Sequence, residues 1–405
     1  MTTITQPDFL SPEFKANPFP FYAQLREHAP VHPGPKFRGR PTWLVTRYDD
    51  VAHLLKSEDF AKNPNHALTP EQLRKAPWVP PMFKPLLENN LLSHDPPDHT
   101  RLRALVHQAF TPRMVERMRT ETYALAHELL DKMQAKGGTV DLIEAFALPL
   151  PITIIGRILG VPERDNPKFH RWTQAFVSVG AGGGALLKLP SILRFMRYLR
   201  KLIRQREQEP QDDLVSALVQ AREAGNSLSE DEVLALIFLL LSAGHETTVN
   251  LIASGTLALL EHPDQWHKLR DDPTLVKPAT EELLRFVSPA ETSTERYARQ
   301  DLVIADTKLP RGTLVLGVIA SANRDAERFE APEKVDITRQ NNKHLAFGQG
   351  IHYCVGAPLS RLEGHIAFTA LAERLPELRL AVPPEQLRWR STVVLRGLEA
   401  LPVSF

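Results

Sequence analysis

The sequence predicts a mostly helical α+β protein, and three features of its pattern indicate this class. Apolar residues recur at helical spacing almost without interruption from residue 97 to residue 287, so this segment is expected to form successive helices. Short strand-like runs lie instead near the two ends of the chain, at residues 42–46 and 314–319. No repeat, low-complexity tract or shift in composition divides the chain, so we expect a single domain over residues 1–405.

Composition excludes several classes of protein. The chain has 49 basic and 48 acidic residues, so its formal charge of +1 creates no global field that would attract nucleic acid or an acidic membrane surface. The single cysteine excludes an internal disulfide and any zinc or iron–sulfur site built from cysteines, and it fits a reducing compartment. The N-terminus lacks the layout of a signal peptide. We therefore expect a soluble cytoplasmic protein with no nucleic-acid or membrane partner.

The longest predicted helix begins at a capping box formed by Ser229 and Glu232 and continues past Leu260 to a stop at His262 and Pro263. At 1.5 Å per residue it would be roughly 45 Å long, enough to cross the molecule. Its apolar run at residues 233–241 is too short to span a bilayer, which predicts a buried core helix. Two breaks are expected to be long loops: a proline-rich stretch at residues 77–97 and a glycine-rich stretch at residues 180–184.

The cysteine lies in a loop that could stabilise a thiolate. Residues 347–356 read Phe-Gly-Gln-Gly-Ile-His-Tyr-Cys-Val-Gly, and an amphipathic helix follows towards Arg374. A thiolate at Cys354 would sit at the N-terminus of that helix, where the free amides and the helix dipole favour negative charge, and Pro358 suits the first turn. Three glycines would let the backbone turn tightly or approach a flat partner such as a porphyrin: Gly348, Gly350 and Gly356. Taken in isolation, a buried structural cysteine is the alternative.

The pattern Phe347-x-x-Gly-x-x-x-Cys354-x-Gly resembles the haem-binding signature of the cytochrome P450 family. The resemblance covers essentially the whole chain, from Asn17-Pro18-Phe19 to the end at residues 398–402. It implies a triangular helical bundle with a long central helix over the haem and small peripheral β-sheets. It also implies haem b as cofactor, with Cys354 as the ligand of the iron and with Phe347, Gly348 and Gly356 in the haem-binding loop.

The same resemblance assigns basic residues to the two haem propionates. His99 and Arg103 stand at i and i+4 near the start of a predicted helix, so they would face one way. Arg296 and His352 match the remaining propionate contacts of similar bacterial enzymes. Each of the four, considered alone, is more typical of an ordinary surface charge.

The interior of the long helix holds a glycine and a carboxylate among apolar residues, at Ala243-Gly244-His245-Glu246-Thr247-Thr248. The resemblance makes Glu246 and Thr247 an acid–alcohol pair that relays protons to dioxygen, with Gly244 leaving room for the gas. The alternative is a threonine bonded to its own helix beside a paired glutamate. His245 lies on the opposite helical face from Thr247, so we assign it to packing or tuning.

A further acid–base set is assigned a structural role. Glu282 and Arg285 match the Glu-x-x-Arg pair of the family, and Arg339 matches the arginine that joins it behind the haem. By itself the i, i+3 pair would indicate only a solvated helix face.

Position relative to the motifs predicts a mostly apolar distal pocket, which suits a lipophilic substrate. Its expected lining is the loop at residues 77–91 together with Leu239, Ala243, Ala290, Glu291, Thr292, Val394 and Leu395. Glu291 could bind a hydroxyl or amine of the substrate, and a solvent-facing carboxylate is the alternative.

These observations predict a monooxygenase that inserts one oxygen atom of O2 into a C–H bond of a lipophilic molecule. Runs such as RLEGHIAF look most like the polyketide and macrolide hydroxylases, while fatty acids, terpenoids and steroids remain alternatives. A peroxide-driven peroxygenase and a non-catalytic haem sensor are the competing functions. A separate ferredoxin with its reductase, or a flavodoxin, would supply electrons, docking on the cysteine side near Arg361 of a monomeric enzyme.

Overall fold

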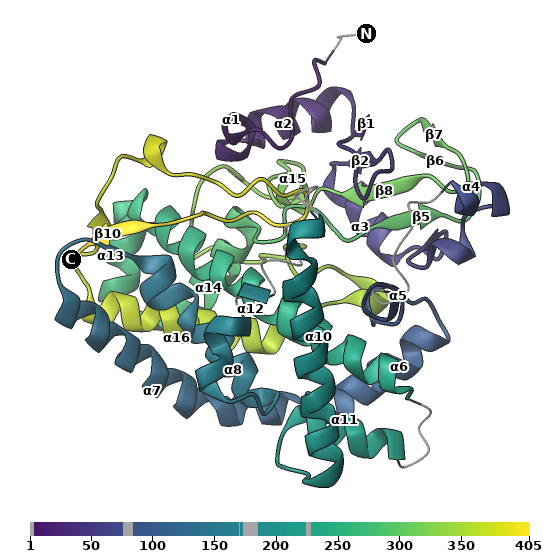
Figure 1. The fold of residues 1–405 in the computed structure, drawn as a ribbon. Helices are drawn as coiled ribbons and strands as arrows, with labels where there is room; N and C mark the ends of the chain where they lie inside the picture. The colour runs from purple at the N-terminus through teal and green to yellow at the C-terminus, as the bar shows by residue number, and fades with distance from the viewer. Residues whose placement is uncertain (1–3, 76–83, 170, 173–184, 224–227) are drawn as a thin grey trace.

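A computed structural model describes residues 4–75, 84–169, 171–172, 185–223 and 228–405 (Figure 1). The glycine-rich stretch at residues 180–184 lies outside the described residues, and the predicted loop at residues 77–91 lies only partly within them. The helices are α1 (Pro12–Ala16), α2 (Phe19–His28), α3 (Tyr48–Lys56), α4 (Pro70–Arg74), α5 (Lys84–Glu88), α6 (Asp98–Ala109), α7 (Pro112–Lys136), α8 (Pro149–Ile158), α10 (Ala185–Gln208), α11 (Leu214–Glu223), α12 (Glu230–Leu260), α13 (Pro263–Asp271), α14 (Val276–Val287), α15 (Ile319–Ala322) and α16 (Ala357–Arg374).

The long helix α12 forms the centre of the helical part. Ser229 caps it, and the reciprocal bonds of the predicted capping box to Glu232 are present. The helix packs against α5, α8, α10, α14 and α16. By length and composition α12 could cross a membrane, but 67% of its apolar window is buried inside the protein. Burial by neighbouring helices explains why this helix is apolar on all sides.

The strands form small sheets at the edge of the helical part. They are β1 (Val31–Pro33), β2 (Trp43–Val45), β3 (Phe60–Ala61), β4 (Val140–Asp141), β5 (Arg296–Ala298), β6 (Leu302–Ile304), β7 (Thr307–Leu309), β8 (Leu314–Gly317), β9 (Arg379–Leu380) and β10 (Pro402–Ser404). The largest sheet has the order β1-β2-β8-β5-β3, and β2 and β8 pair in parallel. Figure 1 shows this sheet, with the β6–β7 hairpin beside it, at the side of the molecule away from α7 and α16. The expected mostly α architecture with peripheral sheets is confirmed.

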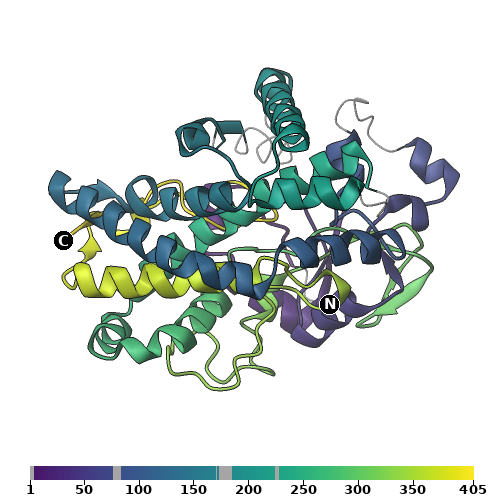
Figure 2. The same cartoon turned by 90° about the horizontal axis from the view of Figure 1, so that it is seen from below.

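The predicted elements differ from the structure in one instructive place. The strand expected at residues 314–319 ends at Gly317, and Ile319 instead begins the short helix α15. A Cβ on Gly317 would lie 3.0 Å from Val51 Cγ1, so α3 packs closely on the end of this strand. Figure 2, seen from below, shows α7 and α16 running side by side, with α16 leading back to the loop that holds the cysteine.

Candidate active site

The cysteine loop turns sharply between residue 347 and the start of α16. The amide of Cys354 donates to the carbonyl oxygen of Phe347 at 2.9 Å. Gly348 and Gly350 have φ angles of +68° and +72°, a region that side-chain-bearing residues rarely adopt. A Cβ on Gly350 would also lie 2.9 Å from the carbonyl oxygen of Leu55, at the end of α3. These two glycines therefore allow the turn and bring α3 against the loop.

Of the two roles expected for the loop glycines, Gly356 does not serve the tight turn. Its φ is −79°, which any residue can adopt, and a Cβ there would meet only the sulfur of Cys354, at 3.8 Å. Gly356 caps α16, whose first turn contains Pro358 as predicted. The absence of a side chain at Gly356 thus leaves space next to the sulfur and does not serve a tight turn.

The surroundings of Cys354 act on its thiol in opposite directions. Burial raises its pKa, while amides of Gly356 and Ala357 that bond the sulfur, together with the guanidinium of Arg103, act to lower the pKa. Net, the pKa of the thiol lies above its usual value. An iron bound at Cys354 would deprotonate the thiol, and the amides of Gly356 and Ala357 would stabilise the thiolate.

Buried basic side chains gather next to the cysteine loop. The rings of His99 and His352 lie 4.2 Å apart, centroid to centroid. Burial lowers the pKa of His99 to about 4 and, with a contribution from the positive charges of Lys62 and Arg296, lowers that of His352. Burial also lowers the pKa of Arg296 to about 10. Such a cluster disfavours its own positive charge, so it fits an anionic ligand that would supply the missing counter-charge.

Two nitrogens of this cluster point to the same conclusion. His99 Nε2 and His352 Nδ1 are buried and have no hydrogen-bond partner among the described residues. Arg103, by contrast, donates to the carbonyl oxygen of Tyr353 at 2.7 Å, and so ties α6 to the cysteine loop. The four predicted propionate residues thus come together from α6, β5 and the cysteine loop, and their unsatisfied donors fit the two carboxylates of a haem.

Sequence reasoning missed one member of this cluster. Lys62 follows β3, is 3% exposed, and donates from Nζ to Thr294 Oγ1 at 2.7 Å and to the carbonyl of Glu295 at 2.9 Å. Burial lowers its pKa well below the usual value. No motif surrounds this lysine, and its partners lie more than 230 residues away. Only the pairing of β3 with β5 brings it to the site.

The helix α12 places the predicted relay residues on two neighbouring faces. Thr247 Oγ1 donates to the carbonyl of Ala243 at 3.0 Å, so the hydroxyl is bonded within its own helix. Glu246 is buried, and its Oε2 accepts from Arg390 Nη1 at 2.8 Å. His245 is also buried and lies 3.4 Å from Glu246 Oε1, in agreement with a packing or tuning role. The structure does not join the acid and the alcohol directly.

Gly244 does not open the space expected for oxygen. A Cβ at this position would lie 3.2 Å from Ile155 Cγ1, on the face of α12 that contacts α8. The glycine therefore permits close packing of two helices, which corrects the role inferred from the motif.

Part of the predicted distal pocket lines a cavity. Leu239 borders it with Leu86 and Phe238, which give it apolar walls, whereas Lys62 and Glu295 give it a charged end. Ala243 lies one turn after Leu239, on an exposed part of α12. Leu239 thus borders a cavity, and this cavity has a more polar end than the sequence indicated.

The remaining predicted pocket residues lie on two segments that bond to each other. Ala290 pairs with Leu395, and the amides of Glu291 and Thr292 both donate to the carbonyl of Val394, at 2.8 and 3.3 Å. These backbone hydrogen bonds hold residues 290–292 next to residues 394–395.

Glu291 faces neither substrate nor solvent, so both interpretations of it were wrong. It is fully buried, and its carboxylate accepts from Lys15 Nζ at 2.6 Å and from Tyr22 Oη at 2.5 Å. The carboxylate therefore anchors the N-terminal helices α1 and α2.

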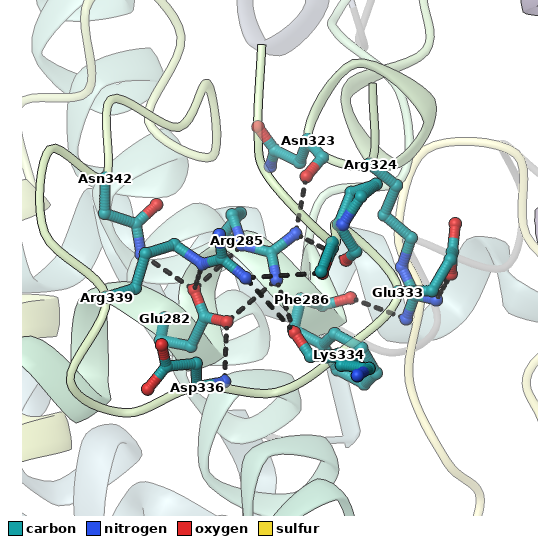
Figure 3. A network of polar contacts seen from close by, with 12 residues as sticks. Glu282, Arg285, Phe286, Asn323, Arg324, Glu333, Lys334, Asp336, Arg339 and Asn342 are labelled. Atoms are coloured by element: carbon teal, nitrogen blue, oxygen red, sulfur yellow. Dashed lines mark hydrogen bonds and ion pairs between the residues drawn. The ribbon is translucent and has the colours of Figure 1, made fainter. Parts of the chain in front are cut away.

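The structural acid–base set is buried, not solvated (Figure 3). Glu282 accepts two bonds of 2.8 Å from Arg285 and one of 3.0 Å from Arg339. The amide of Asp336 and the side chain of Asn342 satisfy the same carboxylate. Arg285 also donates to the backbone carbonyls of Asn323, Pro332 and Lys334. One ion pair thus fixes the chain between α15 and the cysteine loop to α14.

Arg361 is not the free cation that the sequence suggested for partner docking. Its guanidinium donates to both carboxylate oxygens of Glu281, at 2.7 and 2.8 Å, and lies over the ring of Phe347, 4.5 Å from its centroid. The bidentate pair neutralises its charge. Arg361 instead stabilises the cysteine loop from outside.

A cysteine at the start of α16, beside buried basic side chains that fit an anion, is the arrangement expected of a haem-thiolate protein. Among the described residues no group of three or more His, Cys, Asp or Glu could hold a metal ion. A family model described as "Cytochrome P450" matches residues 9–275 and 274–391. The chain belongs to the cytochrome P450 family and is a haem-thiolate monooxygenase.

Relatives of known name agree with this assignment. The chain is 44% identical to "Polyketide biosynthesis cytochrome P450 PksS" of Bacillus subtilis, covering 97% of this chain and 96% of the relative. It is 43% identical to "Cytochrome P450 monooxygenase PikC" of Streptomyces venezuelae, over 97% of this chain and 92% of the relative. Among solved structures, myxobacterial CYP267B1 in complex with myristic acid matches with a TM-score of 0.93 and 38% identity, over 99% of both chains.

Proposed function

We propose that this monooxygenase uses haem b to hydroxylate a lipophilic secondary metabolite of the polyketide or macrolide type. The haem cofactor is supported by two buried nitrogen atoms near Cys354, His99 Nε2 and His352 Nδ1, which have no hydrogen-bond partner among the described residues. The names of PksS, a polyketide biosynthesis enzyme, and of mycinamicin IV hydroxylase/epoxidase, 40% identical, support the substrate class. The match to a myristic acid complex keeps a fatty acid as the second candidate. Terpenoid and steroid substrates are less well supported.

Each group of residues has one task in this proposal. Cys354 binds the iron, and the bound haem supplies the reaction with dioxygen. His99, Arg103, Arg296 and His352 hold the propionates. Glu246 and Thr247 deliver protons, Leu239 and Ala243 contact the substrate, and the residues of the Glu282 pair keep the fold rigid behind the cofactor. We further propose one domain over the whole chain, a monomeric state and a cytoplasmic location.

Substrate class is tested by the spin state of the purified haem protein. A substrate that fills the cavity beside Leu239 would change the spin state of the bound haem and shift the Soret band to shorter wavelength. We expect macrolide and polyketide fragments to give this shift at lower concentration than fatty acids of similar size, because the chain is 44% identical to PksS and 40% identical to mycinamicin IV hydroxylase/epoxidase. The proposal fails for this class if only fatty acids produce the shift.

Replacement of Thr247 by alanine tests proton delivery. We expect the variant to consume reductant at a rate similar to the parent but to form about tenfold less product, because protons reach the dioxygen less selectively. The measurement is product formed per reductant oxidised, with hydrogen peroxide release assayed in parallel. If the parent and Thr247→Ala form the same amount of product from added peroxide, and neither needs reductant, the protein is instead a peroxygenase. Ligand binding without any product would indicate a sensor.

Electrons must come from a separate donor, for which we propose a ferredoxin with its reductase or a flavodoxin. Its docking surface would be a basic hollow beside the cysteine loop, lined by Lys56, Arg328 and Lys343. Next to it in the chain, Ile351 and Tyr353 are 51% and 39% exposed, and so offer an apolar contact. An acidic carrier fits this combination of charge and apolar surface.

Charge reversal at Lys56 tests this surface. In Lys56→Glu we expect reduction of the iron by an acidic ferredoxin to slow roughly tenfold at low ionic strength and to approach the parent rate in high salt, because salt screens exposed charges. Stopped-flow reduction under carbon monoxide measures the rate. Lys136→Glu is the control, since this exposed lysine ends α7 beside the β4–β10 pair, away from α3 (Figure 1). Equal slowing in both variants would contradict the assigned surface.

A further inference from the structure

A buried lysine lines the cavity beside α12, and no carboxylate of the described residues bonds to its ammonium. Lys62 is 3% exposed, and its Nζ donates to Thr294 Oγ1 at 2.7 Å and to the main-chain carbonyl of Glu295 at 2.9 Å. Both acceptors are uncharged, and an ammonium has three hydrogens to donate. Buried charges in proteins are usually paired with an opposite charge. Within the part of the chain that the structure describes, Lys62 thus keeps one hydrogen and its charge for a further partner.

The acids nearest to this lysine are bonded to other groups. Glu295 Oε1 accepts from Arg38 Nη1 at 2.7 Å, and Asp95 Oδ1 accepts from the main-chain amide of Lys62 at 2.8 Å. Burial and the positive charge of Arg296 lower the pKa of Lys62 well below its usual value. An anion placed next to Nζ would act in the opposite direction and favour the charged ammonium.

The uncharged polar groups of the cavity are bonded to the main chain. The hydroxyls of Ser93 and Ser242 donate to the carbonyls of Glu88 and Phe238, and the side-chain amide of Asn90 donates to a carbonyl of α5. The apolar part of the wall consists of Leu86, Leu92, Phe238 and Leu239. The cavity therefore combines a buried cation, next to β3 and β5, with an apolar wall from α5, the segment after it, and α12.

The residues assigned to the haem propionates lie apart from this cavity. None of those four is among the described residues that line it. They gather beside the cysteine loop, where the rings of His99 and His352 meet and Arg103 bonds to Tyr353. Lys62 instead faces the cavity from the end of β3, whose pairing with β5 brings it against the residues that precede β5. The haem has its own set of cations, so Lys62 is available to another ligand.

We propose that Lys62 binds a carboxylate of the substrate at the sheet end of this cavity, while the apolar part of the substrate lies along α5 and α12. The inference rests on the proposed function and narrows its substrate class to open-chain polyketide acids. A carboxylate forms a charge-assisted hydrogen bond with an ammonium, whereas a neutral lactone leaves the buried charge unpaired. Because one end of the substrate is anchored, Lys62 also selects which part of the chain is presented to the haem.

Matched ligands test this assignment in the purified haem protein. The probes are a macrolactone, its ring-opened hydroxy acid and the methyl ester of that acid, each titrated while the Soret band is followed. In the parent we expect the acid to bind about tenfold tighter than the ester, because the ester lacks the hydrogen bond between two charged groups. In Lys62→Met the acid and the ester should bind equally. Lys75→Met is the matched control, since this exposed lysine pairs with Glu71 at α4, and it should keep the preference.

Salt separates a buried cation from surface attraction. The preference for the acid should persist in high salt, because buried charges are screened much less than exposed ones. Loss of the preference in salt would assign it to surface charges and overturn the inference. If Lys62→Met does not fold, as judged by circular dichroism, Lys62→Gln, which retains a donor without the charge, takes its place with the same expected loss.

The haem content of the ligand-free protein separates this role from cofactor binding. We expect Lys62→Met to retain as much haem as the parent. Loss of haem with an unchanged ratio of acid to ester affinity would make Lys62 a propionate ligand and overturn the inference. If the macrolactone shifts the Soret band and the acid binds no tighter than its ester in the parent, the inference fails and the proposed function stands. If none of the three probes gives the shift and fatty acids do, the proposed substrate class fails with it.

Discussion

Replacement of Cys354 by serine is expected to abolish monooxygenase activity and the red-shifted Soret band of the reduced carbon monoxide adduct. Serine is nearly isosteric with cysteine, but its hydroxyl stays protonated at neutral pH where a metal-bound thiol is ionised. Outer contacts to a metal ligand alone change metal affinity by about 10–100-fold. Loss of the ligand itself should therefore lower activity by more than about 100-fold.

The absorption spectrum and a haem assay of the purified variant measure this effect, and far-ultraviolet circular dichroism checks that the fold is retained. The loop has other supports that serine leaves in place, such as the bond from the residue 354 amide to Phe347 and the contact of Arg361 with the Phe347 ring. A serine variant with an unchanged carbon monoxide spectrum would show that the iron has a different ligand.

Replacement of Arg285 by leucine is expected to destabilise the protein by about 3–5 kcal/mol, the usual result of removing one partner of a buried ion pair. Arg285 and Glu282 are both fully buried. Leucine would leave Glu282 with fewer counter-charges, and the carbonyls of Asn323, Pro332 and Lys334 would lose a donor. Since folded proteins are stable by only about 5–15 kcal/mol, the variant should accumulate poorly at growth temperature.

Urea unfolding of parent and variant, followed by circular dichroism and by haem absorbance, measures the difference. Arg270→Leu is the matched control, because Arg270 pairs with Asp271 on an exposed helix end and the same substitution there should move the midpoint little. Similar losses in the two variants would show that the network in Figure 3 contributes no more than a surface pair.

Much of this site could be predicted from short sequence motifs, because the residues that form each motif lie within a few positions of one another. The thiol, the glycines with positive φ and the helix start with Pro358 all lie between residues 348 and 358. The capping box of α12 likewise needs only Ser229 and Glu232. By contrast, the role of Gly244 depends on Ile155 of another helix, and no pattern around residue 244 indicates which neighbour it will meet.

The sequence by itself determined the class of protein and the helical architecture, because periodicity and the cysteine loop are local properties of the chain. Tertiary structure alone decided which charges are paired. It joined Glu291 to Lys15 across 276 residues and Glu246 to Arg390 across 144, and it neutralised Arg361 with Glu281. The physical reason is that a buried charge needs a partner within a few ångströms, and folding supplies that partner from any point along the chain.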